Sequence, residues 1–131
     1  MHRWARRAAL ASICVSFQGD DAFWDFEKFL FANQDSITPE TLDATLRDFA
    51  SRDQRVSAER LDGCLAANEA ETVLSRDEKL ADMYHVDAAP TIFVNGVRKV
   101  GFSNPEALWS TLRVAALDAR SGNRDGAGDK P

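Results

Sequence analysis

The sequence has few of the residues that build redox, metal or nucleotide sites. It contains two cysteines, Cys14 and Cys64, which are far apart in the sequence. It therefore has neither a Cys-x-x-Cys redox pair nor two cysteines at the same short spacing that could bind zinc. The two histidines, His2 and His85, have no cysteine or carboxylate at metal-ligand spacing. A glycine-rich phosphate loop and a nucleophile elbow are also missing. The sequence therefore predicts no catalytic residue of these kinds, no metal ion and no cofactor.

Positive charge and long apolar stretches are scarce as well. The 131 residues carry a formal net charge of −5 and offer no broad basic face, so we exclude nucleic acid as a partner. No apolar run approaches the roughly 18 residues that a membrane span requires. Residues 1–15 place arginines before a short apolar stretch that Ser12 interrupts, so an amphipathic helix is favoured over a signal peptide. One globular domain is the default prediction.

Helical spacing of apolar residues predicts five helices before residue 86. Thr38 is expected to cap the third, with Pro39 as its first residue, and Ser57 to cap the fourth. The second helix, around residues 23–31, carries an aromatic cluster that we interpret as core: Phe23, Trp24, Phe26, Phe29, Leu30 and Phe31. The fifth, over residues 70–84, is expected to turn these side chains inward: Val73, Leu80, Ala81 and Tyr84.

A β-hairpin is predicted over residues 91–100. Asn95-Gly96 tolerates positive φ at both turn positions of a type I′ turn, and short β-branched or aromatic runs flank it. Arg98 and Lys99 suit an edge strand. The first strand has no polar face, so it needs cover on both sides and a partner on its second edge. Residues 103–106 then start a last helix, whose stripe would cover a sheet: Leu108, Trp109, Leu112, Ala115 and Ala116.

The hairpin and several short motifs upstream of it resemble those of a known family. Val86-x-x-Ala-Pro-Thr-Ile-Phe-Val-Asn-Gly is similar to the C-terminal half of DsbA-like thioredoxin-fold thiol–disulfide oxidoreductases. Four short motifs of this chain also resemble motifs that occur in the same order in the inserted helical part of that family: Gln18-Gly19, Phe23-Trp24, Leu30-Phe31-x-x-Gln34 and Cys64-Leu65. The resemblance implies an α/β fold, a partial thioredoxin-like (DsbA-like) fold that is mostly helical with a C-terminal β-hairpin and final helix.

The resemblance also implies a domain division and a missing part. We expect a DsbA-like domain over residues 1–119, with a helical insertion over 4–85 and the hairpin and last helix over 86–119. Residues 120–131 are expected to form a disordered tail. The family's N-terminal strands and its Cys-x-x-Cys are expected to be absent. The first strand of the hairpin would then keep an open edge, through which the chain could self-associate.

Two site predictions follow from the resemblance. In the family the proline before the strand is cis, and the backbone edge beside it holds the substrate. The resemblance therefore implies that Ala89, Pro90 and Thr91 bind substrate. The alternative is a trans proline that simply starts a strand. Ala89 replaces a residue, often threonine, that contacts the reactive sulfur in the family, and this suggests relaxed tuning of a redox site. Some members carry a second bridge at positions similar to Cys14 and Cys64, and two inert buried thiols are the alternative.

The resemblance thus implies a DsbA-like thiol–disulfide oxidoreductase domain that acts on protein thiols or disulfides. Without Cys-x-x-Cys it is expected to be truncated and inactive alone, so whether it is an enzyme stays open. The first alternative is a non-catalytic thioredoxin-like module that binds a peptide or partner protein along the Pro90 edge. The second is a small helical protein in which the hairpin is only structural. The resemblance favours a bacterial, extracytoplasmic or periplasmic origin, although the sequence itself does not fix the location.

Overall fold

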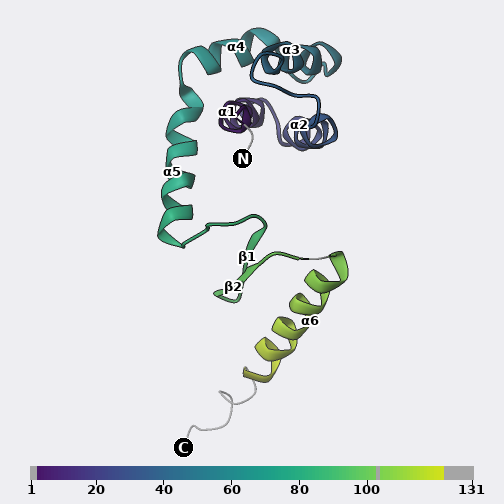
Figure 1. Ribbon diagram of the computed structural model, residues 1–131, viewed down its shortest axis with the longest axis vertical. Helices are drawn as coiled ribbons and strands as arrows, with labels where there is room; N and C mark the ends of the chain where they lie inside the picture. Colours follow the sequence, from purple (N-terminus) through teal and green to yellow (C-terminus); the bar gives the residue numbers. More distant parts are fainter. Residues whose placement is uncertain (1–2, 103, 123–131) are drawn as a thin grey trace, which may run out of the picture. The chain divides into compact units, whose positions relative to one another are not determined.

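The structure, a computed structural model, describes residues 3–102 and 104–122. The chain divides into two compact units, Met1–Leu80 and Ala81–Pro131. Figure 1 shows the order of the elements: α1 (Ala5–Ser16), α2 (Asp20–Asn33), α3 (Leu42–Arg52), α4 (Ala58–Ala66), α5 (Glu69–Met83), β1 (Thr91–Val94), β2 (Val97–Val100) and α6 (Pro105–Gly122). No helix in this part of the chain is both long enough and apolar enough to cross a bilayer.

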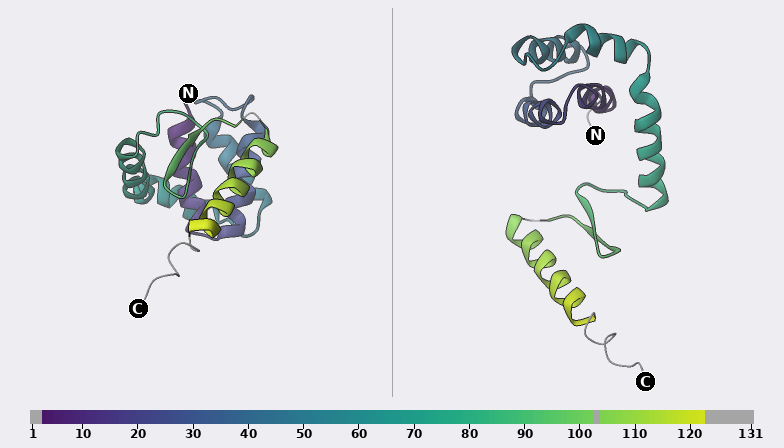
Figure 2. Two further views of the ribbon diagram at one scale, coloured as in Figure 1. Left: turned by 90° about the horizontal axis from the view of Figure 1, so that it is seen from below. Right: turned by 180° about the vertical axis from the view of Figure 1, so that it is seen from behind.

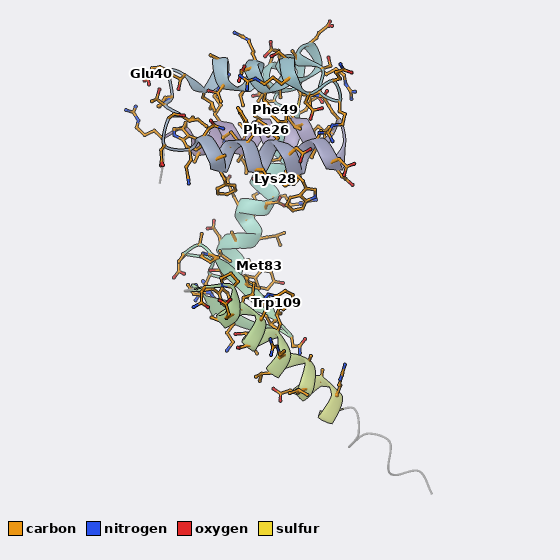
Figure 3. The ribbon with its side chains drawn as sticks, turned by 90° about the vertical axis from the view of Figure 1, so that its right-hand side faces the viewer. Phe26, Lys28, Glu40, Phe49, Met83 and Trp109 are labelled. Atoms are coloured by element: carbon orange, nitrogen blue, oxygen red, sulfur yellow. A yellow bond between two sulfur atoms is a disulfide. The ribbon has the colours of Figure 1, made fainter. Side chains whose placement is uncertain are left out.

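The first unit is a two-layer helical bundle. α1 and α2 form one layer, and α3 and α4 form the other (Figures 1 and 2). Phe26 of α2 and Phe49 of α3 meet between the layers, with ring centroids 4.9 Å apart (Figure 3). Apolar residues from α1, α4 and the start of α5 complete this core, among them Val15, Leu61 and Ala70. The first unit therefore has its own packed apolar interior.

The aromatic cluster of α2 is only partly core, which corrects the sequence interpretation. Phe26 and Leu30 are buried, whereas the side chains of Trp24 and Phe31 are 61% and 67% exposed. Residues four apart lie on the same helix face, so Phe26 and Leu30 share the buried face. Trp24 and Phe31 fall on the opposite side of α2. A stretch with aromatic residues all round the helix could not reveal which side would find a partner.

The start of α3 differs from the prediction, and the start of α4 confirms it. α3 begins at Leu42, so Pro39 is not its first residue. Thr38 and Thr41 instead form a turn, in which the Thr38 hydroxyl accepts a 3.2 Å hydrogen bond from the Thr41 N–H. Ser57 caps α4 as predicted, because its hydroxyl accepts from the N–H of Arg60 at 3.2 Å. A side-chain oxygen at this position satisfies an N–H that has no partner inside the helix.

The second unit consists of the hairpin and α6. The strands are antiparallel, and Asn95 and Gly96 have the positive φ values, 49° and 79°, that the predicted turn requires. The Asn95 side chain donates a 3.1 Å hydrogen bond to the carbonyl of Ala115, which ties the turn to α6. Asn104 caps α6 by accepting from the Ala107 N–H at 2.9 Å. α6 continues to Gly122, and residues 123–131 of the expected tail lie outside the described residues.

Two predicted inward stripes are only partly covered. Leu80 and Tyr84, at the end of α5, are exposed rather than buried. On α6, the side chains of Leu108, Leu112 and Ala115 are half-buried, but Trp109 is 60% exposed and Ala116 is also exposed. Two short strands are too narrow to cover the whole apolar face of an 18-residue helix. Periodicity predicted the faces of these helices but not how much of each would find a partner.

Candidate functional site

The candidate site is the segment that leads into β1. Ala89 and Pro90 are exposed, Thr91 is half-buried, and the Ala89–Pro90 peptide bond is cis. The Pro90 carbonyl accepts a 2.8 Å hydrogen bond from the N–H of Gly101, which fixes the entry to β1 against the end of β2. The Thr91 hydroxyl donates to the Ala88 carbonyl one turn earlier. The three residues predicted for substrate contact therefore form one continuous, accessible segment.

The register of the hairpin decides which backbone groups of β1 face outward. Thr91 is opposite Val100, Ile92 opposite Lys99, Phe93 opposite Arg98 and Val94 opposite Val97. In a hairpin with a two-residue turn, the pair next to the turn exchanges hydrogen bonds, and bonded pairs then alternate along the ladder. Ile92 and Val94 are thus bonded to β2, in agreement with the bond from Gly101 to Pro90.

The N–H and C=O groups of Thr91 and Phe93 consequently point away from β2. Within the described residues, β1 pairs with β2 alone, so this outer edge has no strand partner. An unpaired edge of this kind is a template for another extended chain. Sequence reasoning predicted the open edge, but it did not identify the two residues that carry the outward groups. The position of the Asn-Gly turn in the sequence could have identified them, because a two-residue turn fixes which pairs of the ladder are hydrogen-bonded.

The two faces of the hairpin differ in cover. On one face, the side chains of Val94, Val97 and Lys99 line a hollow of about 580 Å³ together with residues of α6, including Ser110 and Val114. On the other face, Phe93 lies opposite Arg98, and its ring centroid is 5.7 Å from that of Tyr84. Arg98 forms an ion pair with Asp87, in the approach to Pro90.

This second face leaves apolar surface beside the open edge. The side chains of Tyr84, Phe93 and Val100 are all exposed there, at 55%, 43% and 46%. A chain that paired with β1 would therefore meet backbone hydrogen-bonding groups and an apolar aromatic surface together. The sequence analysis, which interpreted Tyr84 as inward-facing, did not predict this surface.

The two cysteines lie in the first unit and are joined to each other. The Sγ atoms of Cys14 in α1 and Cys64 in α4 are bonded, with the Cα atoms 5.9 Å apart. No free cysteine remains in the chain, since these are its two cysteines. A bridged sulfur cannot act as an attacking thiolate. Across residues 3–102 and 104–122, no three histidine, cysteine or acidic side chains gather closely enough to hold a metal ion.

Comparison with known proteins identifies the family. A family model described as thioredoxin matches residues 2–113. Disulfide bond formation protein D of Bacillus subtilis is 29% identical over 109 residues, which are 82% of this chain and 49% of that protein. The Na(+)/H(+) antiporter NhaA 3 of Salinispora tropica is 34% identical over 120 residues, which are 92% of this chain and 17% of the antiporter.

A second antiporter matches in the same way. NhaA 1 of Salinispora arenicola is 33% identical over 125 residues, which are 95% of this chain and 18% of that protein. The chain therefore spans about half of the Bacillus protein and less than a fifth of the two antiporters. No solved structure matches. The family model covers most of the chain. The structure has the expected order of elements, with helices first and then the hairpin and the last helix. The chain thus belongs to the thioredoxin-like, DsbA-like family.

Proposed function

We propose that this chain is a DsbA-like thiol–disulfide oxidoreductase domain that acts on protein disulfides. In this proposal the 131 residues supply the substrate-binding side of the site and not the reactive cysteine pair. Family membership and the name of the Bacillus relative support the reaction class. The accessible segment through Ala89, Pro90 and Thr91 supports the binding role.

The chemistry explains why the chain alone should be inactive. Disulfide exchange needs an attacking thiolate and a second thiol that resolves the mixed disulfide. Both sulfurs of this chain are used in the bridge between Cys14 and Cys64. Catalysis would therefore require a Cys-x-x-Cys from another polypeptide segment, held beside Pro90. We place no catalytic role on any residue of this sequence.

The outward backbone groups of Thr91 and Phe93 are the observation that carries the binding proposal. Extended peptides add to exposed sheet edges through main-chain hydrogen bonds, and the side chains beside the edge supply selectivity. Here the neighbouring surface is apolar and aromatic, with Tyr84 against Phe93. We expect unfolded or extended segments with apolar residues to bind best. Self-association through the same edge would compete with such substrates.

A non-catalytic binding module is the second candidate. Its support is the similarity to two proteins named as Na(+)/H(+) antiporters, whose names do not refer to disulfide chemistry. In this case the same edge would bind a partner protein, and no cysteine pair would be needed. The two candidates differ in one property, which is whether a reactive centre supplied beside Pro90 produces turnover.

The test measures disulfide reduction in insulin by the chain alone and by a fusion. The fusion adds an upstream strand and Cys-x-x-Cys helix taken from a DsbA-like protein, and its control replaces both added cysteines by serine. We expect turnover from the fusion only. A fusion that binds extended peptide but gives no turnover would favour the binding module. Turnover by the chain alone, lost in Cys64→Ser, would contradict both candidates.

A further inference from the structure

A surface pocket lies beside the disulfide of the first unit. Its volume is about 250 Å³, and its lining comes from the two residues that follow α1, from α4 and from the start of α5: Phe17, Gln18, Arg60, Gly63, Cys64 and Glu69. Of the two described cysteines, Cys64 lines this pocket and Cys14 does not. The pocket therefore borders one residue of the bridge and not the other.

Burial of the two cysteines supports the same asymmetry. Cys14 is 1% exposed and lies among buried residues of α1 that include Ala11 and Val15, whereas Cys64 is 7% exposed. The residue before Cys64 is glycine, and a Cβ atom placed on Gly63 would meet no atom within 4 Å. Open space thus lies next to Cys64 on the exposed side of α4. A larger side chain at position 63 would partly fill it.

We propose that Cys64 is a site of mixed-disulfide formation with small-molecule thiols and that the bridge is exchangeable in the folded protein. The thiolate of the small thiol attacks Cys64 Sγ, and the bond between the two protein sulfurs breaks. Cys14 Sγ leaves with the bonding electron pair and takes up a proton. A second thiolate then attacks the small thiol's sulfur in the mixed disulfide, which releases an external disulfide and the Cys64 thiol. Two electrons pass from two external thiols to the bridge.

Two charged side chains should tune the attack. Arg60 precedes Cys64 by four residues, so both lie on the same face of α4, and Glu69 lines the pocket from α5. Arg60 favours an approaching anion, and Glu69 opposes it. With glutathione as the thiol, Arg60→Gln should slow the attack by roughly two- to fivefold, and Glu69→Gln should accelerate it similarly. The thiolate of 2-mercaptoethanol carries no charge other than the one on its sulfur, so its rate of attack should depend less on these two substitutions.

The first experiment locates the adduct. The oxidised chain is mixed with glutathione under native conditions, quenched with acid and an alkylating agent, and mapped by mass spectrometry. We expect glutathione on Cys64 and the alkylating group on Cys14. Glutathione mainly on Cys14, or equal amounts on both cysteines, would overturn the proposal. Reduction whose rate does not depend on glutathione concentration would also overturn it, because opening of the fold would then limit the reaction.

The second experiment blocks the pocket without removing the bridge. Gly63→Leu should slow the bimolecular reaction roughly tenfold, since access to the attacked sulfur controls the rate. Leucine is also a better helix former than glycine, so the fold should not be weakened. The matched control is Ala66→Leu, which adds a leucine to an exposed position of α4 outside the pocket lining. Equal rates in the two variants, both with unchanged urea midpoints, would contradict attack through this pocket.

Discussion

Phe26 is the largest fully buried side chain of the helical unit, and its ring contacts Phe49 across the two layers. We expect Phe26→Ala to lower the free energy of unfolding by about 3–5 kcal/mol, because it removes apolar burial and leaves a cavity. Phe31→Ala, on the exposed side of the same helix, should change it by less than about 0.5 kcal/mol. Urea unfolding followed by circular dichroism measures both. Similar losses in the two variants would mean that the exposed side of α2 is covered in solution.

The bridge between Cys14 and Cys64 closes a long loop of the unfolded chain, with a sequence separation of 50. In the chain-entropy model this stabilises the fold by about 4 kcal/mol. The double variant Cys14→Ser with Cys64→Ser should lose that amount relative to the oxidised chain, as measured by urea unfolding. The reduced wild-type chain is the control and should match the double variant. Equal stabilities of the oxidised and reduced wild-type chains would show that the bridge does not constrain the unfolded state.

Between elements, Arg55 joins α2 to the turn before α4. Its guanidinium pairs with Asp53 at 2.5 Å and with Asp25 at 2.7 Å. Hydrogen bonds from Arg55 lower the pKa of the Asp53 carboxyl, and bonds from Arg55 and then Lys28 lower the pKa of Asp25. A carboxyl whose pKa is lower in the folded state stabilises the fold above its unfolded pKa. That stabilisation is lost as the pH falls through the folded pKa.

We therefore expect Arg55→Gln to lower the urea midpoint slightly at pH 6. The difference from wild type should shrink below pH 4 and vanish once both carboxyls are protonated. The effect should be small, since these side chains are solvent-accessible. Arg76→Gln is the control, because in the described part of the chain Arg76 forms its ion pair with its sequence neighbour Asp77 on α5. A difference at pH 6 that persisted unchanged at pH 3 would exclude this electrostatic origin.

We expect the chain to associate through the outer edge of β1 into dimers or larger species at high concentration. Thr91→Pro removes one outward N–H without breaking the ladder to β2, and proline is tolerated at the first residue of an edge strand. We expect this variant to have the monomer mass of 14.5 kDa where the wild type and Thr91→Ser exceed it. Light scattering across a concentration series measures the mass. A wild-type chain that is monomeric at all concentrations would contradict association through this edge.

Patterns within single elements predicted much of this structure. The helical stretches, the Ser57 cap and the Asn-Gly hairpin depend on neighbouring residues, so local spacing was sufficient to find them. Burial depends on a partner that local spacing does not specify. Trp24 and Phe31 were therefore interpreted as core, and Trp109 as part of a stripe that covers a sheet, although all three are exposed. The substrate segment at Ala89 came from family resemblance, whereas the outward groups of Thr91 and Phe93 required the strand register.

On the scale of the whole molecule, burial is distributed unevenly. Among the residues whose burial the structure describes, all the buried ones lie between Ala8 and Ala70, and none occurs in residues 81–102 and 104–120. Two strands and one helix do not build an interior that is stable by itself. We expect amide hydrogens of β1, β2 and α6 to exchange through low-energy local opening, and those of α1 and α2 to exchange only through global unfolding. Hydrogen exchange with mass spectrometry measures this. Equal protection in both units would imply a single cooperative fold.

The placement of the bridge also has a consequence during synthesis. Both cysteines precede β1 in the chain, as do all the buried residues of its described part, so translation delivers the complete helical unit before the hairpin exists. Domains generally fold as units, starting from the N-terminal side, while the rest of the chain is still being made. In an oxidising compartment, the helical unit could therefore fold and close its disulfide first. The hairpin would then emerge after the helical unit has folded, and its open edge would be exposed to other chains only from that moment.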